Sequence, residues 1–172
     1  DLDIGIMLPH PSLRQGYRYN GLSFIYRGEI IHEYYKNQLP NYGVFDERRI
    51  FQAGQYSEPI EFKGIKIAPQ ICFDIWFEDG AIHYADKGAD IIISPNASPF
   101  ETLKFGRRGD VVADRINDTG LPLIYLNLIG GQDDLVFDGA SFIMNGDGLI
   151  PVLMDFGKEQ ILLTEWKKQD DK

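Results

Sequence analysis

The 172-residue chain contains one cysteine and three histidines, and basic side chains are fewer than acidic ones, 17 against 26. A single cysteine cannot form an internal disulfide, and the sequence has no apolar run long enough to cross a bilayer. We therefore expect a cytoplasmic protein that does not enter a membrane. The net charge of −9 disfavours nucleic acid as a partner, because clustered Lys and Arg bind its backbone.

The histidines, His10, His32 and His83, are far apart and lack the spacing of metal ligands. We interpret them as structural residues and predict no metal in this chain. The sequence starts at Asp1 without a methionine or a basic, apolar leader. This start argues against a secretory signal in the chain as given and for a processed or excised fragment.

The chain does have enough apolar material for one sizeable core, since 44% of its residues are hydrophobic and 13% are aromatic. Its length favours a single domain, which we place at residues 1–166. The last residues, 167–172, are charged and predict a tail or linker stub.

The spacing of apolar residues predicts a mixed α/β (α+β) architecture in which strands predominate. The prolines at positions 9 and 11 should end the first strand, because proline stops sheet pairing. The pairs Arg27-Gly28 and Lys63-Gly64 read as hairpin turns. We predict strands at residues 2–8, 19–26, 29–35, 60–62, 65–68, 89–94, 123–128, 140–144, 149–153 and 160–166, and helices at 82–87 and 105–119.

Cys72 lies at a strand-to-helix junction, because it follows the apolar run 65–71 and opens the helix-like segment 73–79. Backbone N–H groups at a helix start favour the thiolate, the form that a catalytic cysteine requires. A free cysteine is otherwise one of the most buried residue types and behaves as a small apolar side chain. Position alone leaves both interpretations open.

Four segments carry more specific information: 36–49 with the string LPNYGVFDE, 71–76 around Cys72, 94–99, and 130–141 with the string GGQDDLVFDGAS. Together, in this order, they resemble the glutaminase domain of bacterial glutamine-dependent NAD synthetase. That domain is a branch of the nitrilase, or carbon-nitrogen hydrolase, superfamily.

The resemblance implies an αββα sandwich, here partial, in which a Glu, a Lys and a Cys hydrolyse glutamine to glutamate and ammonia. Cys72 takes the position of the nucleophile and Lys36 that of the lysine. Tyr42, Ser98 and Lys104 match the glutamine-binding positions. In the complete enzyme a C-terminal synthetase domain, which uses ATP and Mg, takes the ammonia to amidate deamido-NAD.

The chemistry of amide hydrolysis is compatible with these roles. An amide is a poor electrophile, so a thiolate attacks it to form a thioester, and the oxyanion needs a cation or N–H donors. Lys36 can supply the charge, and the backbone N–H of Phe73 can be a second donor. The structural alternatives are a surface lysine for Lys36, a packing aromatic for Tyr42 and a turn residue for Ser98, while Lys104 rests on its spacing alone.

Two departures from the family pattern affect function. The resemblance places the general-base Glu on a Pro-Glu segment ahead of this sequence, and its loss costs about 10²–10⁴ in rate, so we expect the isolated chain to be nearly inactive. Missing strands would also expose a sheet edge and favour a homo-oligomer. Phe73 stands where an acidic residue beside the nucleophile can hold the glutamine α-amino group.

Two further polar segments have structural interpretations. Asp46 and Glu47 fit helix-start capping, and the polar segment 130–134 fits a site wall or an interdomain contact. The alternatives for the whole chain are another nitrilase-type amidase, which Phe73 favours, and a non-catalytic interaction module that keeps the fold.

Overall fold

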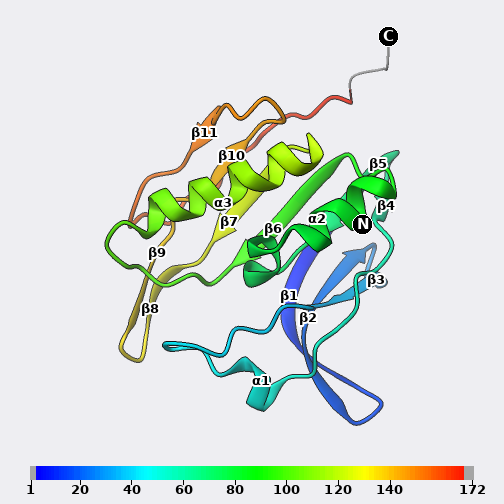
Figure 1. The fold of residues 1–172 in the computed structure, drawn as a ribbon. Coiled ribbons are helices and arrows are strands. Elements are labelled where there is room, and N and C mark those ends of the chain that lie inside the picture. Colours follow the sequence, from blue (N-terminus) through cyan, green and yellow to red (C-terminus); the bar gives the residue numbers. More distant parts are fainter. Residues whose placement is uncertain (1–2, 169–172) are drawn as a thin grey trace.

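A computed structural model describes residues 3–168 of the chain. Its two main sheets and two longer helices form three layers (Figure 1). The helices are α2 (Glu78–Asp86) and α3 (Lys104–Thr119), and two short helical turns, α1 (Glu47–Ile50) and η1 (Cys72–Trp76), lie near the ends of strands.

The central layer is a six-stranded sheet with the order β11-β10-β7-β6-β5-β4. Its strands are β4 (Ile60–Phe62), β5 (Ile65–Pro69), β6 (Ile91–Asn96), β7 (Leu123–Asn127), β10 (Phe142–Met144) and β11 (Val152–Leu153). β5, β6 and β7 run parallel, and the outer pairs are antiparallel. The parallel strands are joined by crossovers that contain α2 and α3, which cover one face of this sheet.

The other face of the central sheet packs against the antiparallel sheet β1 (Gly5–Arg14), β2 (Tyr17–Tyr26) and β3 (Glu29–Tyr35). Alternation along β6 explains how both faces are filled. Ile92 packs in the cluster under the helices, whereas Ile91 and Ile93 pack with Phe24 of the three-stranded sheet. Strand side chains alternate between faces, so one apolar strand serves both cores.

These layers confirm the mixed α/β prediction and correspond to one helical layer and both sheet layers of an αββα sandwich. Within residues 3–168, no second helical layer covers the outer face of the β1–β3 sheet. Within the same range, no helix is long and apolar enough to span a membrane.

The predicted hairpins and both crossover helices are present, with helix starts at Glu78 and Lys104. The prediction that prolines end the first strand is wrong, because β1 continues to Arg14 and pairs Pro9 with Leu22. β1 is an edge strand, and its two prolines are two residues apart, so both missing N–H groups fit the side that faces away from β2.

The predicted strand at residues 160–166 is wrong, because these residues form no strand. The polar segment 130–134 lies in the hairpin of β8 (Ile129–Gln132) and β9 (Leu135–Asp138), and its role as a site wall or interdomain contact stays a prediction. Of the predicted charged tail, 167–172, residues 169–172 lie outside the described range, and Lys168 pairs with Asp90 at 2.8 Å.

Candidate functional site

The parallel strands bring the candidate residues together at their carboxyl ends. Cys72 follows β5, Ser98 follows β6, and Asn127 ends β7. In an open α/β sheet, ligands bind outside this edge, and loops there carry the functional groups. Segments that are 26 residues or more apart in sequence therefore meet at one place.

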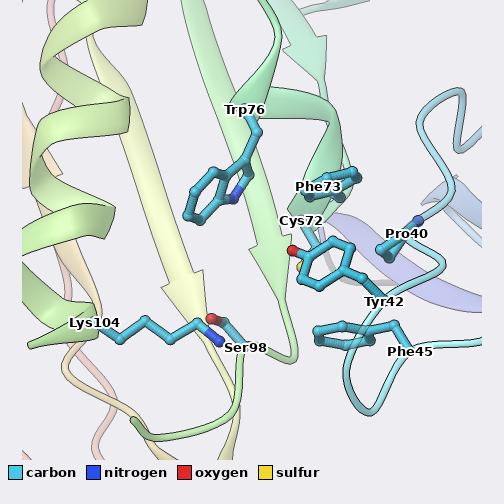
Figure 2. A pocket seen from close by; sticks show the side chains of 8 residues that line it. All are labelled: Pro40, Tyr42, Phe45, Cys72, Phe73, Trp76, Ser98 and Lys104. Atoms are coloured by element: carbon cyan, nitrogen blue, oxygen red, sulfur yellow. The ribbon is translucent and has the colours of Figure 1, made fainter. Parts of the chain in front are cut away.

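A pocket opens at this edge and is shown in Figure 2. Its lining consists of Pro40, Tyr42, Phe45, Cys72, Phe73, Trp76, Ser98 and Lys104. All the residues that the sequence assigns to the site are thus gathered here except Lys36, which lies outside the lining. Five of the eight side chains are aromatic or proline, so the wall is largely apolar.

Cys72 occupies a strained turn, with a backbone φ of 48°, in the left-handed region that non-glycine residues avoid. Burial raises the pKa of its thiol above the usual 9.0, while the charge of Lys36 and the backbone N–H of Ala97 act in the opposite direction. Burial thus acts against the thiolate that the helix start was expected to favour.

Lys36 is buried, with 1% of its side chain exposed, and its Nζ donates to Glu47 Oε1 at 2.7 Å. The second carboxylate oxygen, Glu47 Oε2, is buried without a hydrogen-bond partner. Helix capping by Asp46 and Glu47 is thus not observed: the start of α1 has no side-chain cap bond, and Asp46 pairs with Arg49. Sequence reasoning missed the Lys36–Glu47 pair because 11 positions separate them with an irregular loop between.

Ser98 is held by a buried polar cluster. The Arg108 guanidinium donates to the Ser98 hydroxyl at 3.2 Å and to its carbonyl at 2.8 Å. Asp138 binds the same guanidinium at 2.9 Å, and Asn127 accepts the Ser98 N–H at 3.0 Å. Paired in this way, the buried charges keep their hydrogen bonds and fix the Ser98 loop.

Sequence reasoning missed Arg108, although a signal exists. Arg108, Val112 and Ile116 are four residues apart and share the buried face of α3. A charged residue on such a face predicts a buried partner. Its partner, Asp138, is 30 positions away and could not be identified from the sequence.

The mouth of the pocket is narrow. The rings of Tyr42 and Phe73 lie 5.5 Å apart, and Lys104 extends beside Ser98 while it pairs with Glu101 (Figure 2). The free volume is about 10 Å³, which is room for one water molecule. An amide substrate therefore needs side chains at the mouth to move, and Tyr42 there has 54% of its surface exposed.

Between residues 3 and 168, no group of three His, Cys, Asp or Glu side chains is placed to hold a metal ion. The absence of a metal stays a prediction.

Comparisons with known proteins agree with this geometry. The sequence matches the carbon-nitrogen hydrolase family over residues 2–170. It is 39% identical over 150 residues to the glutamine-dependent NAD(+) synthetase of Rhodobacter capsulatus, covering 87% of this chain and 27% of that protein. It is 41% identical over 145 residues to the enzyme of the same name from Aquifex aeolicus, covering 84% and 26%. The chain thus spans about a quarter of the length of these relatives.

Solved structures show the same fold. The glutamine-dependent NAD+ synthetase of Acinetobacter baumannii superposes with a TM-score of 0.88 at 34% identity, over 92% of this chain and 30% of that one. A carbon-nitrogen hydrolase from Helicobacter pylori superposes with a TM-score of 0.85 at 24% identity, over 91% and 60%. Because the family match extends over residues 2–170, the chain belongs to the carbon-nitrogen hydrolase family.

Proposed function

We propose that this chain is the glutamine-hydrolysing part of a glutamine-dependent NAD synthetase. One arrangement of residues carries the proposal. Cys72 lies in a strained turn, the charge of buried Lys36 acts to lower the pKa of its thiol, and Ser98 and Lys104 line the same pocket. The identity of the substrate, glutamine, and of the final product, NAD, is inferred from the relatives named above. The residues of the site by themselves are compatible with any amide that carries a negatively charged group.

In the proposed reaction, the Cys72 thiol loses its proton, and the sulfur attacks the side-chain amide carbon of glutamine. Lys36 and the backbone N–H of Phe73 stabilise the oxyanion. The C–N bond breaks, ammonia leaves with the added proton, and the acyl group stays on sulfur as a thioester. Water then cleaves the thioester, releasing glutamate and restoring the thiol.

Three charged or polar groups give the substrate its orientation. Lys104 can bind the α-carboxylate once glutamine replaces Glu101 as its partner, with Ser98 beside it. Glu47 Oε2, buried and unpartnered, can accept an N–H of the reacting amide. Tyr42 and Phe73 close over the aliphatic part of the substrate, but Phe73 offers nothing to the α-ammonium group.

The ammonia would pass to the ATP- and Mg-using synthetase domain, which amidates deamido-NAD to NAD. This domain is the proposed partner, in a cytoplasmic homo-oligomer. The 172-residue chain alone should hydrolyse glutamine slowly. The resemblance places the general base in a preceding segment, and both oxygens of Asp74, the carboxylate two residues after Cys72, already accept hydrogen bonds.

Labelling of Cys72 with a glutamine-mimicking electrophile tests the proposal, with Cys72→Ala as the specificity control. We expect selective labelling that glutamine suppresses and ammonia release well below that of a complete glutaminase. Labelling that glutamine does not suppress would identify another amidase, which the aromatic wall at Phe73 favours. No labelling of the folded chain would indicate a non-catalytic module.

A further inference from the structure

A buried carboxylate, Asp74, lies two residues after Cys72 and is fully enclosed. Its Oδ1 accepts the backbone N–H groups of Asn37 and Gln38, at 3.1 and 2.8 Å. Its Oδ2 accepts the Tyr34 hydroxyl at 2.8 Å and the backbone N–H of Ile71 at 2.9 Å. Each oxygen thus has two donors, and a carboxylate can accept this number.

The donors belong to the two segments that carry the proposed catalytic side chains. Asn37 and Gln38 directly follow Lys36, and Ile71 directly precedes Cys72. Tyr34 lies on β3, two residues before Lys36. One carboxylate therefore joins the backbone on both sides of the site, across about 35 residues of sequence.

We infer that Asp74 is a positioning residue. Its carboxylate fixes the Lys36 segment against the Cys72 turn and so holds the Lys36 ammonium group where its charge acts on the Cys72 sulfur. The inference rests on the proposed roles of Lys36 and Cys72. An asparagine would replace one accepting oxygen by an NH₂ group that faces two donors, so it cannot keep all four bonds.

The direct electrostatic effect of Asp74 has the opposite sign, which makes the inference testable. The negative charge of Asp74 raises the pKa of the Cys72 thiol, and the charge of Lys36 lowers it. If Asp74 acts through its charge alone, Asp74→Asn lowers the thiol pKa. If Asp74 positions Lys36, the same variant raises it, because Lys36 loses its fixed place.

The experiment follows Cys72 alkylation by iodoacetamide against pH in the 172-residue chain, with circular dichroism to verify folding. We expect Asp74→Asn to slow alkylation by about three- to tenfold at about pH 8, since one pKa unit changes the thiolate fraction about tenfold. Asp90→Asn is the matched control: Asp90 also accepts a backbone N–H, from Lys66 at 2.8 Å, but precedes β6 at the opposite end of the sheet. It should leave the rate unchanged.

Tyr34→Phe keeps the test decisive if Asp74→Asn does not fold. It removes one donor to Asp74, leaves the negative charge in place and keeps the ring in its buried position. We expect a smaller slowing in the same direction.

The background Lys36→Met/Glu47→Gln separates positioning from general loosening of the fold. Without the lysine charge, Asp74→Asn or Tyr34→Phe should slow alkylation no further. Faster alkylation in Asp74→Asn, or equal slowing in this background, would overturn the inference. Alkylation needs no glutamine, so failure of glutamine protection would refute the proposed function without deciding this result.

Discussion

Removing one partner of the Lys36–Glu47 ion pair should be strongly destabilising, because the pair is buried and the remaining charge would lose its partner. Its atoms are 2.7 Å apart, and its side chains are 1% and 17% exposed. At an effective dielectric constant of about 20, charges at this distance attract by about 6 kcal/mol, before the cost of removing both from water. Replacing Lys36 by Met leaves the Glu47 carboxylate without its cation, and breaking a buried pair in this way costs about 3–5 kcal/mol.

Urea unfolding, followed by tryptophan fluorescence, measures this loss. With a slope of about 2 kcal/mol per M, Lys36→Met should lower the unfolding midpoint by about 2 M. Glu47→Gln should have a similar effect. The double variant should lose only about 1–2 kcal/mol, because no unpaired charge remains and Met fills much of the lysine volume.

The matched control is Lys158, which pairs with Asp155 at the same 2.7 Å but with 67% and 54% of the two side chains exposed. Lys158→Met should leave the urea midpoint unchanged, since exposed pairs contribute little. The reasoning is refuted if the losses of Lys36→Met and Glu47→Gln simply add in the double variant, or if Lys158→Met is equally destabilising.

Other predictions concern titration and substrate contacts. Because burial raises the thiol pKa of Cys72, its alkylation rate should still climb about tenfold per pH unit up to pH 9, and a plateau below pH 8 would contradict this. Lys104→Met should raise the glutamine concentration that half-protects Cys72 by about tenfold or more, without changing the urea midpoint. Phe73→Glu should lower that concentration by about tenfold, and unchanged protection would show that the α-ammonium group is held elsewhere. Burial raises the pKa of Asp74 to about 6, so the folded chain binds an extra proton between about pH 4 and 6. The contribution of this proton to the free energy of unfolding is complete below pH 4 and declines by about 3 kcal/mol as pH rises past 6. Unfolding of Asp74→Asn should not show this decline with pH.

Local patterns determined much of the fold. The hairpin turns at Arg27-Gly28 and Lys63-Gly64 were predicted correctly, because turn chemistry and the two-residue period are properties of short segments. Residues 160–166 were predicted as a strand and form none, since an apolar run becomes a strand only when a partner is available.

The Cys72 junction, the family and five of the eight residues that line the pocket could be predicted from the sequence alone. The arrangement of the charges around the pocket depends on the complete fold. Lys36 pairs with Glu47, Arg108 binds Asp138, and Asp74 joins two distant segments. The physical reason is that burial and long-range pairing set the energy of a charge, and both depend on the complete packing. For that reason the helix-start argument pointed to a thiolate at Cys72, whereas burial in the folded chain raises the pKa of the thiol.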